Sequence, residues 1–244
     1  DDNGTINQDE FNLLFSDTEN GNQIPTVDCY ILAYNDRKNL VTLPESSTDD
    51  TAEAHPLKIN LKNYLAEYRM MTDQVSILDG YIINFGVAFE VVSHRSSNKS
   101  DVKLKCIQKI KNYFNIDKMQ FRQTLYTSDL EYELMDVDGV RAVNYVELTQ
   151  DFNDLIHTEG FIPSADNILL YDKEYDITDG TTIDYTSDDT NHRGIHGWKY
   201  NFKAFYQKGH GNDAFVRNGL ILPPKEPAVF ELKNPNRNIR GVIL

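Results

Sequence analysis

Two histidines, His192 and His196, have the spacing at which two side chains on one helix face can bind a metal ion. Gly194 lies between them and Gly197 follows, and glycine disfavours a helix here. The sequence around them also lacks the carboxylate-plus-histidine pattern of a zinc hydrolase. A surface loop is therefore the better interpretation, and no metal is expected.

A second candidate is a group of acids that resembles a calcium-binding loop: Asp172, Glu174, Asp176 and Asp179. In such a loop the sharp turn needs glycine and the last position needs a bidentate glutamate. The chain has Ile177 and Ile183 at those positions. The pattern favours the solvated face of a hairpin.

Nucleophilic catalysis has no specific support. A pair of Cys106 and His94 can be drawn, but Cys106 falls on the apolar stripe of an expected helix. Cys29 lies in an apolar, strand-like run, so both cysteines are expected to be buried and reduced. Gly209-His-Gly211 is too short for a phosphate-binding fingerprint. We expect no catalytic residue, no cofactor and no enzymatic activity.

A lysine-rich helix is the remaining candidate for a charged site, with Lys99, Lys103, Lys105, Lys109 and Lys111. The nearby aromatic residues fall on its apolar stripe and not among the lysines. A solvated or partner-facing surface is therefore favoured over nucleic-acid binding.

The net charge of the whole chain also argues against nucleic-acid binding. The 244 residues carry a formal net charge of −14, with −10 in residues 1–53, −6 in residues 172–189 and +3 in residues 208–244. An acidic total argues against nucleic acid, because phosphate contacts need an excess of Lys and Arg. Opposite local charges suit charge-matched protein contacts, although a merely solvated surface has the same pattern. No run approaches the roughly 18 apolar residues of a membrane helix, so no membrane partner is expected.

The first residue is Asp, and no basic-then-apolar signal peptide follows it. We expect the chain to be the carboxy-terminal portion of something longer or a trimmed form.

The elements that must position any site centre on residues 81–92, where every odd position is large and apolar. This period of two predicts a strand with one covered face. Apolar residues at helical spacing predict helices over about 60–71 and 100–114. The first of these stripes contains Leu61, Tyr64, Leu65, Tyr68 and Met71.

The same module continues with a predicted strand at 120–126 and a short helix from Ser128. Ser128-Asp-Leu-Glu131 has the form of a capping box, and Asp138-Gly139 is suited to end the helix. Residues 140–148 predict the closing strand. This order indicates an α+β fold, a small sheet with helices on one face in a ferredoxin-like α/β module.

Three regions are expected. Residues 1–58 form an acidic arm with a strand pair (27–34 and 40–43) and a linker, residues 59–150 form the α+β module, and residues 151–244 form a β-rich, loop-heavy region. In the last region, Asp179-Gly180 predicts a hairpin turn, and Tyr200–Tyr206 alternates. The apolar carboxy terminus is expected to pack in the core or against a neighbour.

The sequence resembles the baseplate wedge proteins of contractile-tailed bacteriophages, the baseplate J-like family. The resemblance is carried by Asn60-Leu-Lys-Asn-Tyr-Leu-Ala-Glu-Tyr-Arg-Met-Met-Thr-Asp73 and by Ile77-Leu-Asp-Gly-Tyr-Ile-Ile-Asn-Phe-Gly-Val-Ala-Phe-Glu-Val91. Residues 98–110, Asp138-Gly-Val140 and the tail from Pro224 also fit. It covers residues from about 25 to 150 and the final 20 or so, while the Pro44–Pro56 linker departs from it.

The resemblance implies a structural protein of the virion, located in the tail baseplate and made in the host cytoplasm. It implies a homodimer that joins a ring of dimers around the tail hub and binds other wedge and sheath-initiating proteins. Host attachment would then shift the balance between two arrangements of the ring.

Three contact surfaces follow from these expectations: the edge of the Tyr81–Val92 sheet, the lysine helix and the apolar carboxy terminus. The candidate interface residues are Lys103, Lys105, Lys109, Phe230, Ile239, Val242, Ile243 and Leu244. The Tyr-rich stretch 168–206 and the lone Trp198 suggest an alternative, a receptor- or glycan-binding tail module. A cell-wall hydrolase is a third possibility for which no residue set stands out.

Overall fold

The computed structural model describes residues 26–43, 56–68, 74–150, 170–171, 173–175, 182–184, 197–200, 202, 216–217, 219–224 and 226–244. The chain divides into two compact units, Asp1–Ile31 with Leu43–Asp79 and Leu32–Thr42 with Gly80–Leu244. This division falls within the expected residues 1–58 and within the expected module of residues 59–150. The described part is mixed α and β with small sheets, which confirms the α+β class in its coarse form.

The first unit is built on a parallel strand pair. β1 (Thr26–Ile31) pairs with β4 (Gln74–Asp79) in unbroken register, and α2 (Pro56–Ala66) precedes β4. Asp79 ties this unit together, since its Oδ2 lies 3.0 Å from Lys58 Nζ on α2 and its Oδ1 accepts a hydrogen bond from Leu43 N. Lys58 is itself buried, so this ion pair anchors the start of the helix.

The helix predicted over 60–71 begins earlier, at Pro56, a residue suited to the first helical turn because it needs no amide hydrogen. Its expected apolar stripe is covered only in part. Leu61 and Leu65 are half-buried, whereas Tyr64 and Tyr68 are 58% and 71% exposed. Met71 lies outside the described residues.

The second unit is organised around β5 (Tyr81–Asn84) and β6 (Gly86–Ser93), which Phe85 joins. The strand predicted here forms, and the odd positions Ile83, Phe85, Val87, Phe89 and Val91 are at most 2% exposed. The even positions Ile82, Asn84 and Ala88 are fully buried as well, so both faces are covered over residues 82–89 and not only the one face that was expected. Full burial of one such side chain stabilises the fold by about 1.5–3 kcal/mol.

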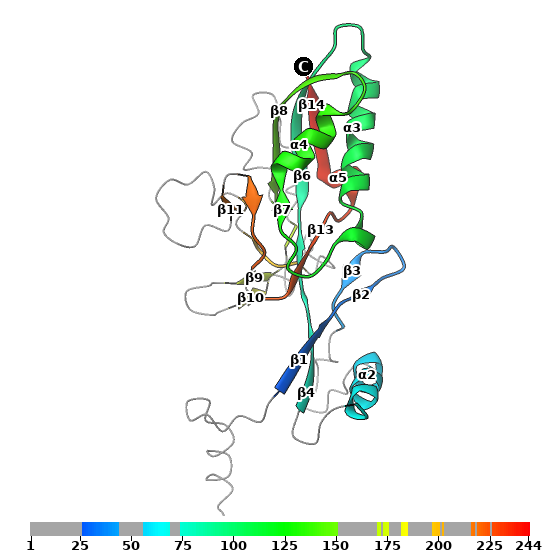
Figure 1. Ribbon diagram of the computed structural model, residues 1–244, viewed down its shortest axis with the longest axis vertical. Coiled ribbons are helices and arrows are strands. Elements are labelled where there is room, and N and C mark those ends of the chain that lie inside the picture. Colours follow the sequence, from blue (N-terminus) through cyan, green and yellow to red (C-terminus); the bar gives the residue numbers. More distant parts are fainter. Residues whose placement is uncertain are drawn as a thin grey trace, which may run out of the picture. The chain divides into compact units, whose positions relative to one another are not determined.

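β6 lies in the middle of a three-stranded sheet, whereas β5 forms a two-stranded sheet with β13 (Ala228–Glu231) in the described ranges. β8 (Val140–Thr149) pairs antiparallel with β6 on one side, and β14 (Ile239–Ile243) pairs parallel with β6 on the other. β13 pairs parallel with β5, and the short α5 (Pro235–Asn238) connects it to β14. The carboxy-terminal segment therefore runs alongside the central strand for its whole length (Figure 1).

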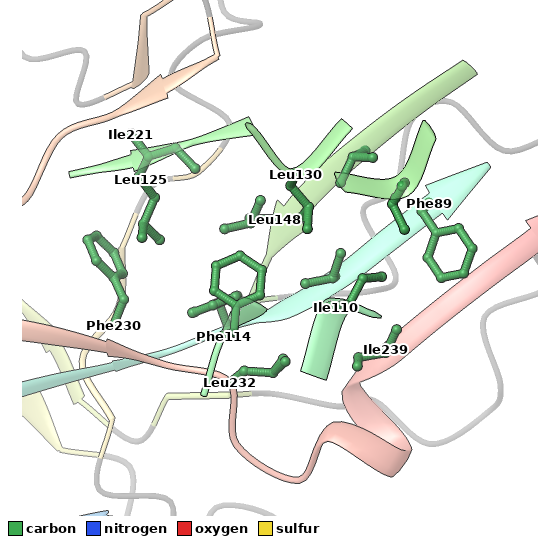
Figure 2. Packing of buried hydrophobic residues seen from close by; sticks show 14 of the residues in the cluster. Phe89, Ile110, Phe114, Leu125, Leu130, Leu148, Ile221, Phe230, Leu232 and Ile239 are labelled. Atoms are coloured by element: carbon green, nitrogen blue, oxygen red, sulfur yellow. The ribbon is translucent and has the colours of Figure 1, made fainter. Parts of the chain in front are cut away.

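Two helices cover one face of this sheet. α3 (Lys99–Tyr113) begins after Asn98, whose side chain accepts a hydrogen bond from Ser100 N, and α4 (Thr127–Met135) packs beside it. Figure 2 shows Ile110, Phe114 and Leu130 from this helical layer gathered with side chains of the strands in one core.

Smaller elements complete the second unit. β2 (Ala33–Tyr34) and β3 (Leu40–Val41) form a hairpin, and β9 (Lys173–Tyr175) pairs antiparallel with β10 (Thr182–Asp184). A three-stranded sheet has the order β11 (Val216–Arg217), β12 (Leu220–Ile221) and β7 (Leu125–Tyr126). The 3₁₀ turn η1 spans Ile116–Lys118.

Three local predictions need correction. The strand expected over 120–126 is reduced to β7, because the chain turns at Arg122, which has φ 57°. The capping box at Ser128 does not form, since α4 begins at Thr127, and the Thr127 hydroxyl and amide both donate to Gly219 O. α4 ends at Met135, with Asp136 as its C-cap, and so before Asp138-Gly139, where its end was expected. Gly139 has φ 95°, a backbone conformation that glycine adopts readily.

Candidate assembly surfaces

Two of the five lysines of α3, Lys105 and Lys109, are paired with carboxylates of the chain. Lys105 Nζ lies 3.1 Å from Asp101 and 3.3 Å from Asp138, and Lys109 Nζ lies 2.9 Å from Glu133 and 3.1 Å from Asp136. The hydrogen bond to Asp101 is the main cause that raises the pKa of Lys105, and the hydrogen bond to Glu133 is the main cause that raises the pKa of Lys109. These ion pairs join α3 to α4 and to the turn after it, so the two ammonium groups are already neutralised.

Lys103 differs from these two residues. It is exposed on α3 and makes no ion pair with the described part of the chain. Of the candidate lysines, it alone presents an uncompensated charge to a partner.

The carboxy-terminal candidates fall into two groups. Phe230 and Ile239 are 1% and 6% exposed and pack in the core (Figure 2), so in this fold they serve internal packing. Val242 and Ile243 are half-buried, and Leu244 is 51% exposed. The last three residues thus lie at the surface while the strand that carries them belongs to the sheet.

The backbone of β14 defines a free edge. Leu244 N donates to Val91 O, and Leu244 O accepts from Ser93 N. Because backbone groups alternate in direction along a strand, those of Ile239, Gly241 and Ile243 point away from β6. Within the described ranges no strand pairs with this side of β14.

β8 lies at the opposite edge and is built differently. Its pairing with β6 shifts register twice, which leaves Arg141 and Asn144 as extra residues on β8. Such bulges and polar residues blunt an edge against further pairing. β14, in contrast, pairs in unbroken register over five residues without Pro, and Arg240 is its single charged residue. β14 is therefore the edge that is better suited to accept another strand.

The exposed apolar side chains of α2 form a further surface, in the first unit. Leu57, Tyr64 and Tyr68 are more than half exposed, and the rings of Tyr64 and Tyr68 lie 5.1 Å apart between centroids. The sequence assigned the two tyrosines to a half-buried stripe; their exposure is found only in the structure.

A groove of about 570 Å³ lies between α3, the turn around η1 and α4. Its lining includes Lys118, Asp129, Glu133, Met119 and Tyr126. Both charges are represented among its lining residues, so their types alone favour neither an anion nor a cation.

Gln150 is the centre of a buried polar cluster that the sequence analysis did not predict. Gln150 Nε2 donates to Asn84 O and Trp198 O, and Gln150 Oε1 accepts from Tyr200 N. The Trp198 ring packs edge-on against Tyr81 at 4.8 Å. These contacts hold the Gly197–Tyr200 segment against β5, so Trp198 has a structural role besides any binding role.

Glu231 is a further buried polar residue that the sequence analysis did not single out; it lies between Phe230 and Leu232. Its side chain is 3% exposed, and Oε1 accepts a 2.8 Å hydrogen bond from Leu40 N. Burial raises the pKa of this carboxyl to about 7, against the opposing effects of the Leu40 amide and Lys233.

The structure adds no support for the residues considered as catalytic or metal-binding. Burial raises the pKa of the Cys106 thiol to about 11, so its nucleophilic thiolate form is scarce at neutral pH. His192, His196 and most of the acidic group at 172–179 lie outside the described residues. In the ranges that are described, no three His, Cys, Asp or Glu side chains gather as a metal site. No described helix is long and apolar enough to cross a membrane.

Two comparisons with known proteins find no relative of this chain. No family model matches the chain, and a search of curated proteins finds no significant match.

Proposed function

We propose that the chain is a structural subunit of a phage tail baseplate wedge, which self-associates and binds other wedge and sheath-initiating proteins in the virion. The baseplate part of this proposal is supported by the sequence motifs in residues 60–91 and near the carboxy terminus. We also propose a ferredoxin-like relationship for the central module, supported by the two helices over one face of its sheet.

The self-association part is supported by one observation, the regular and unprotected edge of β14. A second copy aligned antiparallel with Gly241 opposite Gly241 places Ile239 opposite Ile243 of the other copy. It also places Arg240 opposite Val242, so no like charges meet directly. The junction is held by main-chain hydrogen bonds along the outward-facing side of β14, and the same patch serves both copies, as a two-fold interface requires.

A proline at the outward-facing amide tests this contact. Ile243→Pro removes a donor that β6 does not use, so the sheet within one chain keeps its ladder. Ile243→Ala is the matched control, because it loses similar packing and keeps the amide. We expect native mass spectrometry to show dimers for wild type and Ile243→Ala and monomers for Ile243→Pro. Equal dimer fractions in all three would reject the β14 edge as the contact.

A further inference from the structure

The hairpin Leu32–Thr42 contacts the rest of the second unit through Leu40. This residue is 4% exposed and packs with Ile82 and Val229 in a small apolar cluster. Its amide donates to Glu231 Oε1. The turn of the hairpin is closed by its own bonds, in which Asn35 Oδ1 accepts from Arg37 N and Asn39 N. The hairpin is thus a self-contained element with a defined attachment point.

The attachment point is a carboxyl group in an apolar setting. Glu231 Oε2 is buried and has no hydrogen-bond partner in the described part of the chain. Asn84, its register partner on β5, is uncharged. Lys233 is the charged side chain that acts on Glu231, while Asp36, Arg37 and Lys38 lie in the exposed turn of the hairpin.

The docked hairpin favours one protonation state of Glu231 over the other. Either state can accept the Leu40 amide hydrogen. The neutral acid fits the apolar cluster, whereas a carboxylate is strongly disfavoured without water. Lifting the hairpin gives the carboxylate access to water, and its proton passes to solvent.

We propose that the Leu32–Thr42 hairpin is a strap controlled by the protonation state of Glu231, docked while the carboxyl is neutral and released when it is charged. Because the pKa of Glu231 is raised from 4.5 to about 7 while the hairpin is docked, the change falls between these two pH values. A strap of this kind exposes Leu40, Ile82 and Val229 on release.

Amide hydrogen exchange at Leu40 between pH 4 and 8.5 tests the strap, after correction for the intrinsic pH dependence of exchange. The carboxyl has a pKa of about 7 when the hairpin is docked and near 4.5 when it is free in water. Protection is therefore expected to be constant below about pH 4.5, to fall by up to about tenfold per pH unit between pH 4.5 and 7, and to level off above pH 7. Glu231→Gln keeps an acceptor for the Leu40 amide but has no charge, so its protection should stay constant throughout.

Glu147→Gln is the matched control, since Glu147 is also a buried glutamate of this unit, 7% exposed, on β8. It should keep the wild-type pH dependence. Constant wild-type protection over the whole range overturns the proposal without any variant. So does a Glu231→Gln variant that loses protection with pH as wild type does.

Discussion

The ring of Phe89 lies directly over Gly241, its register partner on the neighbouring strand β14. A Cβ atom built on Gly241 would lie 2.1 Å from Phe89 Cζ, closer than real contacts allow. β14 therefore reaches its place in the sheet because residue 241 has no side chain.

Gly241→Ala should lower the free energy of unfolding by about 1–3 kcal/mol, the usual cost of overpacking a core. Urea unfolding of the full chain measures this. In a Phe89→Leu background the narrower side chain leaves room, so the penalty of Gly241→Ala should shrink. Strictly additive effects of the two changes would contradict the proposed contact.

How far the sequence predicts this fold depends on the range of the interactions. The strand around Phe85 and the helix around Cys106 were predicted because their periodicity is local. The places of β13 and β14 were not, because parallel pairing with a segment about 150 residues away leaves no local pattern. The Ser128 capping box failed for a related reason, since Thr127 is engaged by distant Gly219.

Glu231→Gln should change stability in a pH-dependent way. The pKa of Glu231 is about 7 in the folded state and near 4.5 when free, so between these values the folded chain holds a proton that the unfolded chain has released. Stability then falls as pH rises through this window, by up to about 3 kcal/mol above pH 7. The variant should match wild type below pH 4.5 and exceed it at pH 8.

Urea unfolding at pH 4 and pH 8 checks this difference, with Glu147→Gln as the comparison. A Glu231→Gln variant that is less stable than wild type at pH 8 would mean that the ionised carboxylate is well tolerated in the fold.

Charge reversal on α3 should distinguish the ion-paired Lys105 from Lys103, which has no ion pair in the described chain. Lys105→Glu places a third acid beside Asp101 and Asp138, so it should lower the melting temperature seen by circular dichroism. Lys103→Glu touches no ion pair of the described chain and should leave that temperature unchanged. Identical melting temperatures for the two variants would show that the ion pairs do not hold the helices in solution.

Because Lys103→Glu should leave the fold intact, it is also the cleaner probe of assembly. Any weakening of association in this variant can be assigned to a lost contact. The sequence alone grouped the three lysines together, because the acids that pair with Lys105 and Lys109 include distant residues on and after α4.

The two cysteines should react at different rates. Cys106 is fully buried with a raised pKa, whereas Cys29 on β1 is half-exposed. Alkylation with iodoacetamide at pH 8, followed by mass spectrometry, should modify Cys29 first, and both in denaturant. Early modification of Cys106 in the folded chain would contradict its place in the core.

The central claim, that this chain builds an assembly through its own surface, is tested most directly by its mass in solution. Light scattering after size exclusion, across a concentration series, should give a mass rising towards twice the 28.1 kDa of one chain. A mass of 28.1 kDa at every concentration would contradict self-association of this chain.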